Sequence, residues 1–305
     1  MPGEPGRTAR ATDGTREIYT AHFNLKERPF NLVPDPDFLF WSAQHQRAFS
    51  MLEYGIMTRA PITLITGEVG AGKTVLLQQL LRTVDEDVRI GLVSNAQGAR
   101  GELLRWVLMA LDQEAPPEAT YVDLFARFQT YLIAQYAAGR RVILIFDEAQ
   151  NLSRESLEEL RMFTNINSGK DELLQLILVG QPELREMVSS YDLRQFAQRI
   201  SSSYHLPSMT RDTLAAYVAH RLTVAGATRP IFMDDAFDPI FEATRGVPRL
   251  VNQLCDLSML YAFTDDLQLV DGGTVRQVLA DGVFFGGGQA AEPEPGPAPL
   301  VLRQR

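Results

Sequence analysis

Eight consecutive residues, 67–74, have the types and spacing that bind phosphate groups. They read GEVGAGKT, fit the pattern G-x-x-x-x-G-K-[ST] and stand between an apolar run and a segment of helical period. Glycines let the backbone wrap closely around phosphates, while its N–H groups and the following helix N-terminus supply donors and positive potential. Lysine here reaches the β- and γ-phosphates, and the threonine hydroxyl ligates Mg²⁺. An ordinary glycine-rich turn is the alternative. The predicted ATP and Mg²⁺ site comprises Gly67, Glu68, Val69, Gly70, Ala71, Gly72, Lys73, Thr74 and Val75.

A second element ends in two carboxylates. Residues 142–146 form an apolar run, and Asp147 and Glu148 follow it directly. Because α/β sheets bind ligands at the carboxyl ends of their strands, these side chains should lie beside the nucleotide. We expect Asp147 to hold Mg²⁺ and Glu148 to orient and deprotonate the attacking water. The alternative is an acid pair at the start of a helix.

One amide and three arginines are further candidates. Gln181 follows an apolar run, where its amide would contact the γ-phosphate or the attacking water; alternatively, it only begins the next helix. Arg194 and Arg199 lie in the segment LRQFAQRI, and Arg249 follows Gly-Val-Pro. Composition assigns these arginines no role, because single arginines on helices are usually solvated.

Four short apolar runs indicate how these residues are positioned. They cover residues 61–66, 88–94, 141–147 and 173–180, and each precedes a stretch of helical period. This alternation predicts a parallel sheet with crossover helices. Runs that are apolar on both faces predict helices on both sides of the sheet. The expected fold class is therefore α/β, followed by a small all-helical domain.

The chain divides into two predicted domains and two predicted tails. Residues 18–207 form the nucleotide-binding α/β domain, and residues 208–285 form a smaller helical domain, because strand patterns fade after about residue 206. Residues 1–17 lack periodicity, and residues 286–305 are rich in glycine and proline. Both ends are therefore predicted to be disordered.

Charge and cysteine content exclude several classes of protein. The 305 residues carry 29 Lys and Arg against 38 Asp and Glu, a net charge of −9, which argues against attraction of the whole surface to nucleic acid or anionic lipid. The single cysteine, Cys255, excludes an intrachain disulfide and a multi-thiolate zinc site. No stretch reaches the roughly 18 apolar residues of a membrane span, and the N-terminus lacks a signal peptide's apolar core. We expect a cytoplasmic protein, at most peripheral at the inner membrane.

The order of these motifs resembles that of AAA+ ATPases of the P-loop NTPase fold. The phosphate loop matches Walker A, the strand ending in Asp147 and Glu148 matches Walker B, and Gln181 stands at a polar strand end. A Gln-Arg-Ile segment and a Gly-x-Pro-Arg-x-x-Asn helix follow. The resemblance implies that Arg249 is the sensor 2 arginine of the helical lid, which reads the state of the nucleotide.

Within that superfamily, three segments resemble the ExeA/GspA secretion ATPases. They are residues 23–36 (FNLKERPFNLVPDP), Glu68-Val69 inside Walker A, and residues 178–184 (LVGQPEL). The resemblance covers roughly residues 18–280 and extends to related ATPases encoded with exosortase and exopolysaccharide loci. Secretion members can continue into a membrane span and a peptidoglycan-binding domain. Since this chain shows neither, the short, soluble type is the closest match.

The family implies the function that we expect. Arg199 would be an arginine finger that reaches a neighbour's γ-phosphate, with Arg194 the less favoured candidate. Together with Lys73, Glu148, Gln181 and Arg249, it would let a ring or helical homo-oligomer hydrolyse ATP and so drive or regulate a cell-envelope export or assembly system, with an envelope or inner-membrane protein as partner. The alternative is a DNA-binding, ATP-dependent switch of the transposition-regulator type.

Overall fold

The computed structural model describes residues 19–85, 87–94, 102–168 and 171–286, so both predicted tails, apart from Gly286, lie outside the described residues. By contacts the chain forms two units. The α/β unit comprises Val33–Met209 and Val247–Arg249. The helical unit comprises Thr210–Gly246, the described residues from Leu250 onward and the described part of Met1–Leu32.

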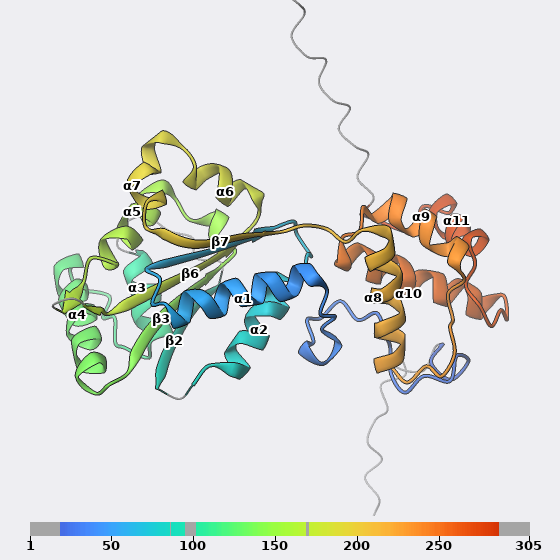
Figure 1. Cartoon of the computed structure of the whole chain (residues 1–305), viewed down its shortest axis with the longest axis horizontal. Coiled ribbons are helices and arrows are strands. Elements are labelled where there is room, and N and C mark those ends of the chain that lie inside the picture. The colour runs from blue at the N-terminus through green and yellow to red at the C-terminus, as the bar shows by residue number, and fades with distance from the viewer. Residues whose placement is uncertain (1–18, 86, 95–101, 169–170, 287–305) are drawn as a thin grey trace, which may run out of the picture. The chain divides into compact units, whose positions relative to one another are not determined.

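A parallel five-stranded sheet forms the centre of the α/β unit (Figure 1). Its strand order is β2-β3-β6-β1-β7. The predicted parallel sheet is thereby confirmed, because neighbouring strands pair in parallel register throughout. The strands are β1 (Ile62–Gly67), β2 (Val88–Ser94), β3 (Arg141–Asp147), β6 (Leu174–Gly180) and β7 (Ile200–Leu206). Residues of β4 (Asn167–Ser168) and β5 (Asp171–Glu172) form a separate antiparallel pair.

Helices cover both faces of the sheet, as the doubly apolar strands predict. In β3, Ile143 and Ile145 pack into the core under one layer, whereas Leu144 and Phe146 pack under the other. The first layer consists of α1 (Ala43–Met57) and α2 (Lys73–Thr83). The second consists of α3 (Glu102–Ala110), α4 (Tyr121–Ala137), α5 (Arg154–Phe163), α6 (Pro182–Val188) and α7 (Arg194–Ala197).

Strand β7 was not among the strands that the sequence predicts. Its sequence, ISSSYHL, lacks an apolar run, and only Ser202 and Leu206 are buried. Because β7 is the edge strand beside β1, one of its sides has no neighbouring strand, and polar residues are tolerated there. In the parallel register Ile200 lies opposite Ile62 and Leu206 opposite Gly67.

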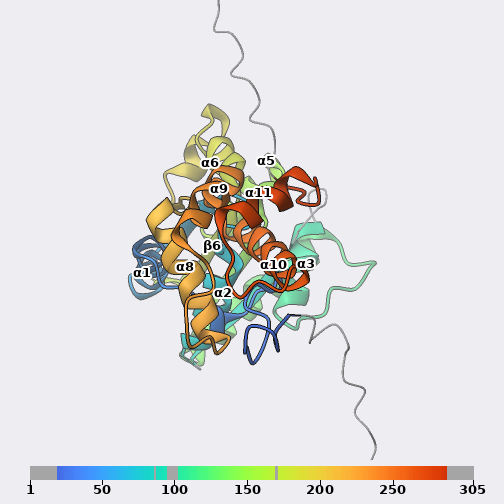
Figure 2. The same ribbon diagram turned by 90° about the vertical axis from the view of Figure 1, so that its right-hand side faces the viewer.

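The helical unit contains α8 (Arg211–Val224), α9 (Asp234–Thr244), α10 (Pro248–Thr264) and α11 (Gly272–Ala280) (Figure 2). Thr210 caps α8, because its side chain accepts a hydrogen bond from the backbone N–H of Thr213 at 3.3 Å. Cys255 is fully buried in this unit, as expected for a core residue. None of the helices within the described residues is long and apolar enough to cross a membrane.

Residues 19–32 group with the helical unit, although the sequence assigns them to the α/β domain. The reason is a set of contacts between these residues and residues far along the chain. Arg28 pairs with Asp256 of α10, and the N–H of Lys26 donates to the carbonyl of Ala225 at 2.8 Å. The ring of Phe30 lies edge-on to Phe232 at 6.0 Å between centroids. These aromatic and charged residues of the entry segment therefore complete the helical core.

Candidate active site

The phosphate loop joins the fully buried strand β1 to helix α2, which begins at Lys73. Gly70 and Gly72 have φ angles of 78° and 99°, a left-handed region that residues with a Cβ adopt at a cost. A Cβ on Gly72 would also come within 2.9 Å of Nε2 of His45. The glycine spacing of the motif thus matches the backbone that the loop adopts.

His45 supports this loop, although no motif in the sequence singles it out. Its ring lies buried on α1, where Nδ1 is 2.8 Å from Oγ of Ser42 and Nε2 is 3.2 Å from the carbonyl oxygen of Ala71. Burial lowers the pKa of His45, against the opposing effect of its hydrogen bond to Ala71. The imidazole is therefore neutral at pH 7, and it ties the loop to α1.

Lys73 is buried and folded back onto its own loop. Its Nζ donates to the carbonyl oxygens of Gly67 at 2.7 Å and Glu68 at 2.9 Å. Burial lowers the pKa of Lys73, and the neighbouring carboxylates of Glu148 and Asp147 oppose that shift. A phosphate that replaces the two carbonyl contacts would meet this ammonium group in a partly desolvated place, where charge attraction is strong.

Thr74 and Asp147 lie together although 73 residues separate them. The hydroxyl of Thr74 donates to Oδ2 of Asp147 at 3.3 Å. Burial raises the pKa of Asp147, and the nearby carboxylate of Glu148 acts in the same direction. A bound cation would reverse this effect, because it favours the ionised carboxylate. Carboxylate and hydroxyl oxygens are ligands that Mg²⁺ accepts, and Mg²⁺ usually shares such ligands with phosphates. The pair therefore fits the predicted magnesium site.

Two amides hold the carboxylate of Glu148. Its Oε2 accepts hydrogen bonds from Nε2 of Gln150 at 2.6 Å and from Nε2 of Gln181 at 3.1 Å. The side chain of Gln150 also accepts a bond from the backbone N–H of Gln181 at 3.0 Å, so it links the ends of β3 and β6. Burial raises the pKa of Glu148, but the two amides and the charge of Lys73 outweigh it and lower the pKa overall. Glu148 is therefore ionised at neutral pH.

Sequence reasoning found Gln181 but missed Gln150. One feature of the sequence could have identified Gln150: it stands two residues after Glu148, just beyond the end of the strand. Gln181 precedes α6 and makes no side-chain cap to that helix, so its amide is directed to Glu148 instead. The structure fits both interpretations, because Gln181 is the N-cap residue of α6 and its amide also contacts Glu148.

The main chain of Arg249 lies beside the phosphate loop. Val247–Arg249 group with the α/β unit, and the N–H of Arg249 lies 3.3 Å from the carbonyl oxygen of Gly70, to which it donates. A Cβ on Gly70 would approach Cβ of Arg249 to 2.5 Å, a second reason for glycine at that position.

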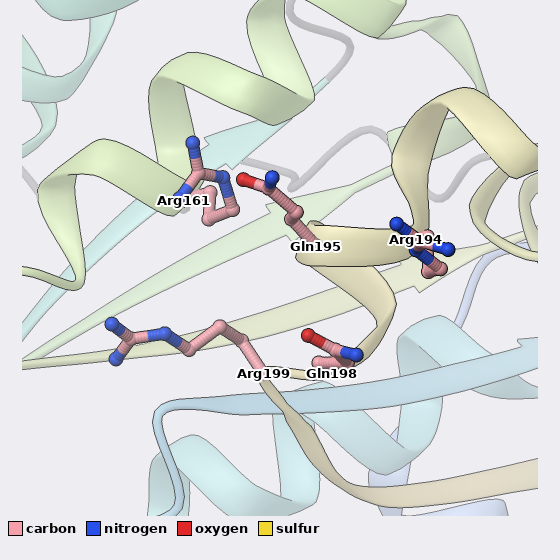
Figure 3. Close-up of a pocket in the computed structure, with 5 residues that line it drawn as sticks. All are labelled: Arg161, Arg194, Gln195, Gln198 and Arg199. Carbon is pink, nitrogen blue, oxygen red and sulfur yellow. The ribbon is translucent and has the colours of Figure 1, made fainter.

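Arg199 and Arg194 lie at the opposite edge of the sheet, where the strands begin, and they help to line a pocket there (Figure 3). Arg199 immediately precedes β7, whose first residue pairs with the start of β1, whereas the phosphate loop follows the end of β1. Six strand residues span about 20 Å, which exceeds the reach of an arginine side chain. Arg199 donates to Oδ1 of Asn165, and Arg194 lies over the ring of Tyr191 at 5.2 Å. Neither arginine reaches the phosphate loop of its own copy.

Comparison with known proteins agrees with this geometry. Residues 56–188 match the model of an AAA domain, the domain of ATP-hydrolysing enzymes. Over 246 residues the chain is 37% identical to General secretion pathway protein A of Aeromonas hydrophila. That alignment covers 81% of this chain and 45% of the relative, so the chain spans less than half the length of the protein it matches.

Solved structures share the fold at low sequence identity. CDC6P of Pyrobaculum aerophilum has a TM-score of 0.63 at 17% identity, and the match covers 88% of this chain and 72% of that one. The ORC2 protein of Aeropyrum pernix, solved as ADPNP-ADP complexes, has a TM-score of 0.57 at 17% identity, with 78% and 67% covered. The AAA fold that the motifs predicted is therefore confirmed.

Proposed function

From an AAA domain and a homologue among the general secretion pathway proteins, we propose that this chain is a magnesium-dependent ATPase that acts as an oligomer in cell-envelope export. One observation carries the enzymatic part. Lys73 and Thr74 come from the start of α2, Asp147 and Glu148 come from the end of β3, and these two segments meet at the edge where the strands end.

The residues divide the work of ATP hydrolysis among them. Lys73 exchanges its bonds to the loop carbonyls for bonds to the β- and γ-phosphates. Thr74 and Asp147 would hold Mg²⁺, which neutralises charge on the phosphates when bound. Glu148 is ionised and takes the proton of the attacking water, while the amide of Gln181 orients that water or the γ-phosphate.

Nucleotide binding and phosphate release in the presence of Mg²⁺ test this assignment. Lys73→Ala removes the charge that meets the phosphates, so it should abolish both binding of ATP and turnover. Lys26→Ala, which changes a lysine of the helical unit, is the matched control and should behave as wild type. Hydrolysis at the wild-type rate by Lys73→Ala would overturn the proposal.

The proposed oligomer follows from the position of Arg199. This side chain is too far from its own phosphate loop to act there, so as an arginine finger it would contact ATP held by a second copy. Light scattering of wild type with a non-hydrolysable ATP analogue should show assembly that is lost with ADP. A monomer at every concentration and nucleotide state would contradict it.

Arg249 is proposed to read the state of the nucleotide. Its main chain already contacts the phosphate loop, and a guanidinium group bonds phosphate oxygens in a bidentate manner. Arg249→Ala should therefore weaken binding of an ATP analogue more than binding of ADP. Equal losses for the two nucleotides in a calorimetric titration would assign Arg249 a merely structural role.

The export role rests on the similarity to General secretion pathway protein A, and the exported substance, exopolysaccharide or protein, is part of the proposal. A strain that lacks the gene should lose export, and wild type should restore it while Lys73→Ala should not. Salt-sensitive retention of the ATP-bound protein on duplex DNA, with export intact in the deletion strain, would favour the transposition-regulator function instead.

A further inference from the structure

An apolar patch is exposed on the helical unit, where the connection from α10 to α11 passes the start of α9. It consists of Met233, Leu267 and Leu269, which are 46%, 42% and 42% exposed. Phe232 pairs with Val270 in a parallel bridge, and both side chains are buried. Because side chains alternate along an extended backbone, Met233 and Leu269, the neighbours of this pair, are directed to the opposite, solvent side. Leu267 precedes Leu269 by two residues and is exposed as well.

Carboxylates are in excess around the apolar patch. Those within two residues of its members belong to Asp234, Asp235, Asp265, Asp266 and Asp271. The cations that lie near these segments belong to Arg211, Arg229 and Arg276. Within the described residues no ion pair occurs for Asp235 or Asp265, and Asp266 lies 3.9 Å from His22. The apolar patch therefore has an acidic rim that the local arginines do not neutralise.

Residues 300–305 of the same chain have the matching chemistry. They read LVLRQR, which is three aliphatic residues followed by two arginines on either side of a glutamine. They lie outside the described residues, and residues 287–299 connect them to the helical unit. Aliphatic side chains suit the exposed methionine and leucines, and two guanidinium groups suit the acidic rim. Polarity and charge therefore select this segment as the occupant of the apolar patch.

The connecting residues are long enough for this segment to reach the apolar patch of its own copy. Helix α11 rises about 12 Å, and the extended chain before and after it adds at most about 32 Å, so Leu269 and Gly286 lie no more than about 44 Å apart. The 14 residues from Gly286 to Leu300 extend to about 46–50 Å. A tether of this kind gives an effective concentration near the millimolar range, so a contact that is weak between separate molecules is sufficient.

We propose that residues 300–305 bind the apolar patch of their own helical unit, with the aliphatic residues 300–302 over Met233, Leu267 and Leu269 and the two arginines at the acidic rim. The contact requires neither ATP nor a second copy of the chain. A protein partner that uses the same surface would have to displace the segment first. The segment would thus control access to the apolar patch.

Methyl NMR of the full chain tests the contact. A nitroxide attached to the variant Gln304→Cys should broaden the methyl signal of Met233 until most of its intensity is lost, and reduction of the nitroxide should restore it. Cys255 is fully buried, so the label should not attach there. Met57 of α1 is 80% exposed and serves as the reference for nonspecific collisions. Its signal should lose less intensity than that of Met233.

Paired variants separate the apolar contact from the ionic one. Leu300→Ser together with Leu302→Ser should restore the Met233 signal without any change in charge, and Leu267→Ser with Leu269→Ser should do the same from the side of the patch. Leu81→Ser changes a leucine of α2 that is 37% exposed, so it is the matched control and should keep the broadening. Raising the salt from about 0.05 M to 0.5 M should weaken the contact, because exposed charges are then screened.

Three results would overturn the proposal. One is a Met233 signal that the nitroxide leaves at full intensity. Another is equal broadening of Met57 and Met233, which would mean that the segment has no specific site. The third comes from a mixture in which one copy carries the nitroxide and the other the labelled methyl groups. Broadening of Met233 there, as strong as within one copy, would show that the segment binds a second copy instead.

Discussion

The two edges of the sheet, one where its strands end and one where they begin, differ in charge and in what they can bind. At the edge where the strands end, one buried lysine stands among four carboxylates, and a glycine loop leads into a helix N-terminus. At the edge where β7 begins, the pocket lining has three arginines and no carboxylate. One edge can hold a nucleotide, a cation and a water; the other can only stabilise negative charge. In our proposal, each edge is therefore half of a site that two copies complete.

The largest expected effect is on the arginine side. Arg199→Ala should bind ATP almost normally but lose hydrolysis by roughly 10³–10⁵-fold, the range for arginine fingers that act from a neighbour. Mixing Arg199→Ala with Lys73→Ala should restore about a quarter of the wild-type rate if copies mix at random, because one in four neighbour contacts then has both halves intact. Phosphate release from the mixture checks this. If the copies co-assemble and activity is not recovered, the two edges do not supply separate halves of a shared site.

The next effect concerns the base on the carboxylate side. Glu148→Gln keeps the shape of the side chain but removes the proton acceptor, so ATP should bind and turnover should fall by roughly 10²–10⁴-fold. Mixing Glu148→Gln with Lys73→Ala should give no recovery, because both changes damage the same edge. Single-turnover kinetics with the mixture measures this, and recovery equal to that of the Arg199→Ala mixture would show that the two edges are not separate halves.

A smaller effect should come from the amide clamp. Gln150→Ala removes one of the hydrogen bonds that lower the pKa of Glu148, so the pKa should rise and the acid limb of the kcat profile should move to higher pH. The rate at neutral pH should fall roughly 3- to 10-fold. Gln113→Ala, which removes an amide that bonds only to nearby main-chain carbonyls, is the control. An acid limb unchanged from wild type would show that Gln150 does not tune the base.

The smallest effect should come from His45 and should be on stability. Burial lowers the pKa of this imidazole in the folded protein, so between that pKa and about 6.5 only the unfolded chain takes up the proton. Stability should therefore decrease as the pH falls below about 6.5. His45→Gln should reduce this pH dependence. Urea unfolding at pH 7.5 and 5.5 measures the difference, and an identical pH dependence in the variant would contradict the assignment.

Contiguous patterns in the sequence were sufficient to predict the nucleotide edge. The glycine spacing, the lysine and the threonine lie within eight residues, and their geometry follows from the backbone of one loop between one strand and one helix. Four strands were also predictable. Central strands β1, β3 and β6 are buried on both faces and therefore apolar, and edge strand β2 carries enough aliphatic residues to be recognised. Edge strand β7 escaped prediction because its sequence lacks an apolar run.

The sequence by itself determined which chemical groups the chain has and in which order, down to Lys73, Thr74, Asp147 and Glu148. Only the tertiary structure decided which distant groups meet: Gln150 with Gln181, and His45 with the phosphate loop. It also decided that residues 19–32 complete the helical unit. The physical reason is that a loop motif is fixed by neighbouring backbone angles, whereas contacts between segments depend on strand register and helix packing, which arise only when the whole core is assembled.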